Sequence, residues 1–105
     1  MLITTTPTIE GHPIKQYIGV VTGETIIGAN AIKDFFASIH DVIGGRTSSY
    51  EKVLRQGKDT AIKDMMQNAL QMGANAIVGI DLDYEAIGAN NTMLMVTVSG
   101  TAVII

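Results

Sequence analysis

The chain has 105 residues, of which 47% are hydrophobic and 16% are charged. The length suits a single domain over residues 1–105. Ten acidic and seven basic side chains give a formal net charge of −3, which argues against a nucleic-acid partner because such partners usually require a basic face. The absence of cysteine excludes disulfides, thiolate metal sites and a cysteine nucleophile.

The ends of the chain bear on targeting and on membranes. Residues 1–7 lack the basic start and the long apolar run of a secretory signal. Residues 86–105 carry no charge, but they are rich in β-branched residues and include Gly, Asn, Ser and Thr, which favours a buried strand over a membrane helix. We therefore expect a cytoplasmic protein without a membrane partner.

The N-terminal region predicts two strands. Residues 2–5 are expected to form a short strand that ends before Pro7. Residues 14–27 are apolar and β-branched, which predicts a long strand with a bend at Gly19 or Gly23.

A first helix is expected over residues 30–43. Asn30 is placed to cap it, and its apolar residues recur at helical spacing. Gly44 and Gly45 then provide a stop signal.

The strongest local signal marks a second, longer helix over residues 48–72. Ser48 and Glu51 form an S-x-x-E capping box, and Gly73 is placed to end the helix. Gly57 lowers helix stability by about 1 kcal/mol relative to alanine, so we expect a neighbouring backbone to come close there. The main apolar stripe of this helix comprises Tyr50, Val53, Leu54, Gly57, Ala61, Met65, Ala69 and Met72, and it is widened by Ile62, Met66 and Leu70.

Two further strands follow the long helix. Residues 74–85 alternate with period two, which places Ala76, Val78, Ile80, Leu82 and Tyr84 on one face and Ile77, Gly79, Asp81, Asp83 and Glu85 on the other. Residues 88–91 predict a loop, whose asparagines tolerate positive φ. Residues 93–105 are apolar at nearly every position, which predicts a central strand.

The element order predicts an α+β fold with two layers. In it, a β-α-β-β core forms an antiparallel sheet, strands 14–27 and 74–85 flank the last strand, and the long helix covers one face. Apolar side chains would then remain on the opposite face: Ile77, Met93, Met95, Val103 and Ile105. Soluble monomers rarely expose such a patch, and the charged fraction is below the roughly 25% that is usual, so we expect a neighbouring subunit to cover it.

Three sequence blocks together resemble the YbjQ-like family of small bacterial proteins. They are GGRTSSYE at residues 44–51, GANAIVGIDLDYE at residues 73–85 and SGTAV at residues 99–103. The resemblance covers nearly the whole chain. It implies a dodecin-like subunit that assembles as a pentamer, and some members carry the label "putative heavy-metal-binding", although the family has no settled biochemical role.

Carboxylates and histidines are the candidate metal ligands. Asp81, Asp83 and Glu85 share one strand face and could bind a hard cation such as Ca²⁺ or Mg²⁺, or they could form a charged strand that discourages edge-to-edge aggregation. His12 and His40 are weaker candidates because neither has a second ligand at metal spacing. Soft heavy metals prefer thiolate or imidazole, and the chain has no thiolate. The cofactor is therefore unknown, with a divalent metal as one option.

The turn before the long helix is a candidate for anion binding or for subunit contact. A helix N-terminus offers free N–H groups and partial positive charge, which an anion such as phosphate could use. The pattern matches no established phosphate loop, so contact between subunits is the favoured interpretation. The candidate residues are Gly44, Gly45, Arg46, Ser48, Tyr50 and Glu51.

The sequence as a whole predicts a self-assembling, non-enzymatic protein, a homopentamer of unknown ligand. No serine–histidine–acid triad is recognisable from spacing. Two alternatives stay open, namely a module that binds metal ions or small anions and an enzyme whose site forms between subunits.

Overall fold

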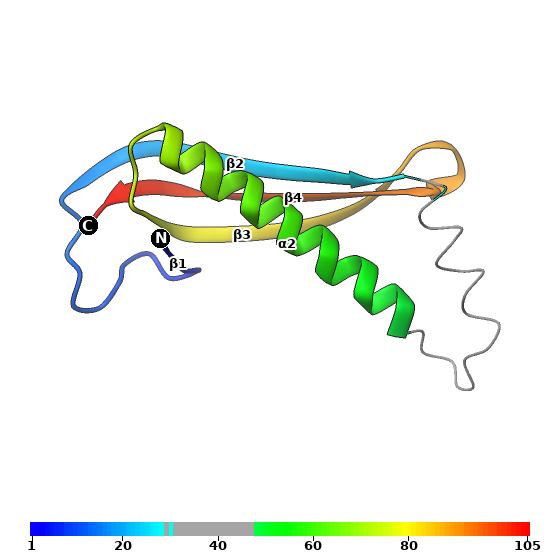
Figure 1. The fold of residues 1–105 in the computed structure, drawn as a ribbon, viewed down its shortest axis with the longest axis horizontal. Helices are drawn as coiled ribbons and strands as arrows, with labels where there is room; N and C mark the ends of the chain where they lie inside the picture. Colours follow the sequence, from blue (N-terminus) through cyan, green and yellow to red (C-terminus); the bar gives the residue numbers. More distant parts are fainter. Residues whose placement is uncertain (29, 31–47) are drawn as a thin grey trace.

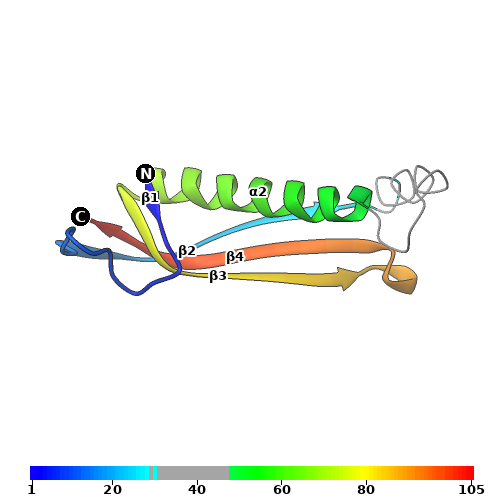
Figure 2. The ribbon, with the colours of Figure 1, turned by 90° about the horizontal axis from the view of Figure 1, so that it is seen from below.

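One long helix lies across one face of a four-stranded sheet (Figures 1 and 2). The computed structural model describes residues 1–28, 30 and 48–105. Its elements, in chain order, are β1 (Leu2–Ile3), β2 (Gln16–Ile27), α2 (Ser48–Gln71), β3 (Ala76–Ile87), the short 3-10 helix η2 (Ala89–Asn91) and β4 (Met93–Ile104). The predicted α+β class, the β-α-β-β core and the long helix are confirmed.

The sheet has the strand order β1-β3-β4-β2. The last strand is central, as predicted, and it runs antiparallel to both β2 and β3. β1 pairs in parallel with the start of β3, so the sheet is mixed and the prediction of a purely antiparallel sheet needs this correction. Two-residue β1 was too short to reveal its direction in the sequence.

The extra helix predicted over residues 30–43 lies, apart from Asn30, outside the described residues. The structure does describe one additional helical turn, η2, within the predicted loop at residues 88–91. Asn90 and Asn91 have φ values of 59° and 54°, which confirms that this loop uses the tolerance of asparagine for positive φ.

Helix α2 ends where its glycine signal predicts. Gly73 has a φ of 90°, a conformation that side chains with a Cβ rarely adopt. The Ala74 N–H then donates a hydrogen bond of 3.0 Å to the Ala69 carbonyl, and the Gly73 N–H donates one to the Leu70 carbonyl. These bonds satisfy carbonyl groups that a helix end otherwise leaves unpaired, and they turn the chain directly into β3.

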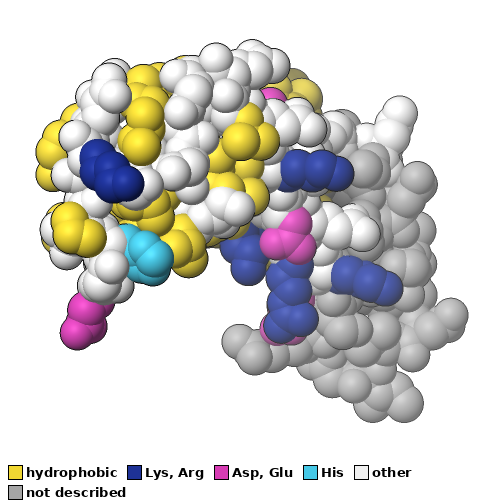
Figure 3. Space-filling model, turned by 60° about the vertical axis from the view of Figure 1, so that its left-hand side comes forward, with side chains coloured by type: hydrophobic (Ala, Val, Ile, Leu, Met, Phe, Trp, Pro, Cys, Tyr) yellow, Lys and Arg dark blue, Asp and Glu magenta, His cyan; other side chains and the backbone are white. Residues whose placement is uncertain are grey.

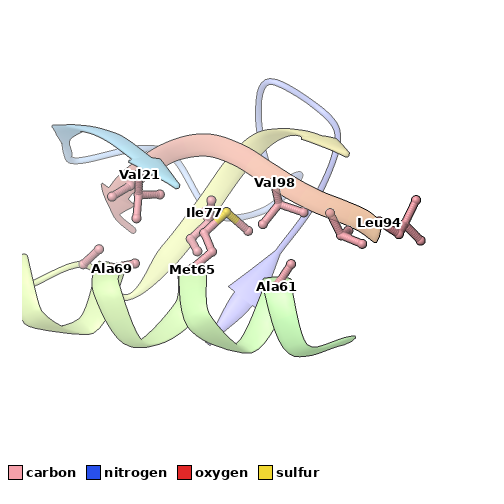
Figure 4. Packing of buried hydrophobic residues seen from close by; sticks show 10 residues of the cluster. Val21, Ala61, Met65, Ala69, Ile77, Leu94 and Val98 are labelled. Atoms are coloured by element: carbon pink, nitrogen blue, oxygen red, sulfur yellow. The ribbon is translucent and has the colours of Figure 1, made fainter. Parts of the chain in front are cut away.

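The main core lies between α2 and the sheet (Figure 4). Helix residues at four-residue spacing point into it, and several are small, so the helix backbone sits close to the strands. The buried members include Ala61, Met65 and Ala69 from α2 and Val21, Ile77, Val96, Val98 and Ala102 from the sheet.

Gly57 is buried where α2 meets the sheet, although its close neighbours differ from the expected ones. A Cβ at this position would lie 2.9 Å from Val96 Cγ2 and 3.0 Å from Ile27 Cδ1. The close approach is therefore made by side chains, and the prediction of a neighbouring backbone was wrong at this position.

We expect Gly57→Ala to destabilise the fold by about 1 kcal/mol, because the gain in helix propensity of about 1 kcal/mol is outweighed by overpacking against the stiff Val96. Urea unfolding at fixed protein concentration measures the change. Gln56→Ala on the exposed side of α2 is the control and should shift stability by less than about 0.5 kcal/mol. A clearly stabilised Gly57→Ala variant would contradict the packing described above.

Two bulges decide which side chains face the helix. The pairing of β3 with β4 shifts between Val78 and Asp81, around Gly79 with its φ of 64°. As a result Ile77 joins Ile80 and Leu82 on the helix side, whereas Val78 shares the opposite face with the carboxylates. The strict alternation predicted for residues 74–85 was therefore wrong before the bulge. In β2 the shift lies at Gly19, one of the two predicted bend positions.

A second, smaller core covers one end of the sheet face opposite α2, here called the far face. Val103 is fully buried there with Ala76 and Val78, and Ile9 and Ile14 of the N-terminal segment pack against them. Ile77 is also fully buried, on the helix side. Two of the five side chains expected to form an exposed patch are thus covered within one copy, and Met93, Met95 and Ile105 are half-buried.

Candidate functional site

The acidic residues of β3 lie together on the far face. Asp81 pairs with Ser99 of β4, and Asp83 pairs with Thr97. Thr97 in turn pairs with Glu24 of β2, so one row across the sheet carries a carboxylate on each side of a threonine. All of these carboxylates are exposed. The prediction that Asp81, Asp83 and Glu85 share one face is consistent with this register.

Asp81 perturbs the ionisation of its neighbour Asp83 on β3. The pKa of Asp83 is raised above its ordinary value of 3.8, chiefly by a side-chain hydrogen bond with Asp81 and by the charge of Asp81, with a smaller contribution from Glu85. A raised carboxyl pKa means that the folded chain binds this proton more tightly than the unfolded chain does. The contribution of Asp83 therefore opposes folding at neutral pH, and this opposition is relieved as the pH falls through the raised pKa.

We expect Asp81→Asn to lower the pKa of Asp83 towards 3.8, because it removes the carboxyl group that hydrogen-bonds to Asp83 and, with it, the neighbouring charge. NMR titration of the Asp83 carboxyl carbon measures this shift. Asp59→Asn, on the exposed surface of α2 and away from the β3 carboxylates, is the control and should leave the Asp83 pKa unchanged. An Asp83 pKa that does not move in Asp81→Asn would contradict the assigned cause.

The β3 carboxylates Asp81, Asp83 and Glu85 do not form a recognisable metal site within one copy. Over the described residues, no group of three or more His, Asp or Glu side chains is arranged to hold a metal ion. His12 is exposed in the N-terminal turn, where its backbone N–H donates a hydrogen bond of 3.0 Å to the Ile9 carbonyl. His40 lies outside the described residues.

The candidate turn before α2 can be placed only in part. Gly44, Gly45 and Arg46 lie outside the described residues, and Ser48 and Tyr50 belong to the first turn of α2. Glu51, also in that turn, is exposed and has an interaction partner. The roles predicted for these six residues therefore stay predictions.

Exposed apolar side chains mark the rest of the far face. Val20 is 77% exposed, Tyr17 is 66% exposed and Ile26 is 55% exposed, and all three lie on β2. Seen from one end of the sheet, hydrophobic side chains also reach the surface, among Lys, Arg, Asp and Glu side chains (Figure 3). Sequence reasoning gave no special role to these residues, because the bulge that sorts them onto the far face is not apparent from alternation alone.

A shallow groove lies on the helix side, between α2 and the edge of the sheet. It has a volume of about 240 Å³ and is lined by Ile3, Thr4, Thr5, Ile62 and Ile80. The lining is largely apolar and contains no titratable side chain, so the groove offers no acid, base or metal ligand.

A family model described as "Putative heavy-metal-binding", YbjQ_1, matches residues 1–105. The chain belongs to this YbjQ-like family. Its fold is similar to that of a crystallised protein of unknown function from Pediococcus pentosaceus, a member of the DUF74 family, which is the same family. The two chains are 20% identical, the match covers 100% of this chain and 97% of the other, and the TM-score is 0.59.

The donor set described above does not fit the metal named in the family description. Soft heavy metals favour thiolate and imidazole ligands, whereas this YbjQ-like chain has no cysteine and its described carboxylates are hard ligands. Among the described residues, no helix is both long enough and apolar enough to cross a membrane.

Proposed function

We propose that this protein acts as a self-assembling, non-enzymatic subunit whose partner is a second copy of itself. The observation that carries the proposal is the exposure of Tyr17, Val20 and Ile26 on one strand of a chain with few charges. Full burial of such a side chain is worth about 1.5–3 kcal/mol, so association that covers all three would be strongly favourable. The proposal places the assembly in the cytoplasm, which cell fractionation tests.

A ring is the form of assembly that the sheet supports best. The two edges of the sheet are unlike. One edge is formed by β1 and by the part of β3 beyond it, and the other edge is formed by β2. An interface between unlike surfaces repeats from copy to copy, and it closes into a ring when the rotation allows. The family resemblance implies five copies.

Multi-angle light scattering on a dilute sample tests this proposal. Five copies of the 11.2 kDa chain would give about 56 kDa, whereas a stable species of 11.2 kDa would overturn the assembly. We expect Val20→Lys to weaken association by more than tenfold, because it places a charge in the centre of the apolar surface. Thr60→Lys on the exposed side of α2 is the matched control and should leave the mass unchanged.

Binding of a hard cation is a second candidate function, based on the three exposed carboxylates on the far face of β3. Asp81, Asp83 and Glu85 supply oxygen ligands from alternate positions of β3, and neighbouring copies in a ring would complete the site, because the described residues of one copy do not hold a metal alone. Calorimetry with Ca²⁺, Mg²⁺, Zn²⁺ and phosphate tests this candidate. Saturable heat that Asp83→Asn abolishes would support it, and the absence of saturable heat would exclude it.

A further inference from the structure

Each outer edge of the sheet is covered along only part of its length. On the β3 side, the N-terminal segment covers the first part, where the Thr4 N–H donates to the Ile77 carbonyl at 3.0 Å and the Ile80 N–H donates to the Thr4 carbonyl at 3.2 Å. Beyond this point, residues 81–87 have no described strand beside them on the side away from β4. Because outward groups alternate along a strand, Leu82, Tyr84 and Ala86 present their N–H and C=O groups at this open edge.

On the β2 side, two side chains of α2 cover the edge at Thr22 and Glu24. Asp64 Oδ2 accepts a hydrogen bond of 3.1 Å from the Glu24 N–H, and Asn68 Nδ2 donates one of 2.9 Å to the Thr22 carbonyl. Outward backbone groups alternate along β2 as well, and the bulge between Tyr17 and Gly19 shifts this alternation. Within residues 15–21, Tyr17 and Val20 therefore direct their N–H and C=O groups away from β4. No described strand or helix side chain pairs with those groups.

The two open sections carry complementary side chains. Residues 81–87 carry three far-face carboxylates, so pairing this edge with its own copy would bring like charges together. Residues 15–21 carry the exposed Tyr17 and Val20, with Lys15 as the nearby charge. Unlike pairing therefore places a cation and apolar side chains beside the acidic strand, and it avoids that repulsion.

Resting on the proposed self-assembly, we propose that the open section at residues 15–21, which comprises Lys15 and the first part of β2, pairs with the open section of β3 at residues 81–87 of a second copy. β2 and β3 both run antiparallel to β4, so they share one direction within a subunit. In a ring closed by rotation, with its strands tilted from the ring axis, the new pair is consequently parallel. The open sections lie at different heights along the sheet, and a stagger of this kind is what closing a sheet on itself requires.

Cysteine cross-linking of the full chain tests the pairing, because the chain has no cysteine of its own and only the introduced thiols can react. In the double variant Val20→Cys with Asp83→Cys, a short bismaleimide should link copy to copy and give a ladder of covalent multimers up to the ring. Within one copy the two thiols are separated by two strand spacings, about 10 Å, and by a further offset along the strands, which is beyond the reach of a short linker.

The single variants are the matched controls. Val20→Cys alone and Asp83→Cys alone should give at least tenfold less covalent dimer, because like residues of neighbouring copies lie about one subunit apart. The pair Tyr17→Cys with Asp81→Cys is a second test should the first pair fail to fold, because both positions lie two places earlier on their strands, as a parallel pair with the β2 bulge requires. Abundant dimer from either single variant would overturn the pairing in favour of a two-fold interface.

Light scattering separates the two possible failures. A monomeric wild-type chain would overturn the proposed function together with this pairing. An assembled wild-type chain whose folded double variants form no ladder would overturn the pairing alone.

Discussion

Replacing Gly23 by alanine is expected to destabilise the protein by about 3 kcal/mol or more, the upper end of what overpacking a core usually causes. Gly23 lies where β2 passes under α2. A Cβ there would overlap the Ala61 carbonyl oxygen and the Met65 backbone nitrogen, and it would lie 2.8 Å from Met65 Cβ. Two of these atoms belong to the helix backbone, so the clash can be relieved only by moving the whole helix.

Urea unfolding of Gly23→Ala, followed by circular dichroism at fixed protein concentration, measures this effect. Gly28→Ala is the matched control, since a Cβ at Gly28 meets nothing within 4 Å. It should change stability by less than about 0.5 kcal/mol. Equal midpoints for the two variants would show that α2 does not lie as close to β2 as described.

Replacing Met65 by alanine is expected to have the second large effect, a loss of about 2–5 kcal/mol. Met65 is fully buried and points from α2 into the centre of the main core (Figure 4). Its removal loses the transfer free energy of the side chain and leaves a cavity, because the strands on the opposite side cannot collapse fully into the space.

Met72→Ala is the control for this prediction, since it removes the same side chain from a position that is 38% exposed. It should lower stability by less than about 1 kcal/mol. Thermal unfolding of both variants at one concentration compares them directly. A Met65→Ala variant no less stable than Met72→Ala would place the core elsewhere.

The fold was predictable to the extent that its signals are local. Apolar spacing and Gly73 defined α2, and the nearly continuous apolar pattern of residues 93–105 correctly predicted a central strand. The parallel direction of β1 and the bulge at Gly79 were not predictable, because both depend on pairing with distant strands. That bulge moves Ile77 from the far face to the helix side, which changes the composition of the exposed surface.

The candidate site likewise combines features that local sequence predicts with features that depend on distant contacts. The shared face of Asp81, Asp83 and Glu85 follows from strand alternation after the bulge, so the sequence was sufficient to predict it. The exposed surface of β2 and the open strand edges depend on which segments fold back onto the sheet. Neither Asp64 nor Asn68 carries a sequence signal that it will pair with the backbone of a strand some forty residues away.

Hydrogen exchange at the strand edges tests most directly whether copies cover one another. By the alternation of backbone groups, the amides of Val20, Leu82 and Tyr84 point away from β4 at the open edges, so in an isolated chain they would exchange at rates near those of unstructured peptide. In the assembled protein we predict that all three are protected, and that the protection is lost on dilution as the copies separate. Fast exchange of these amides in a concentrated, folded sample would contradict assembly through the open edges.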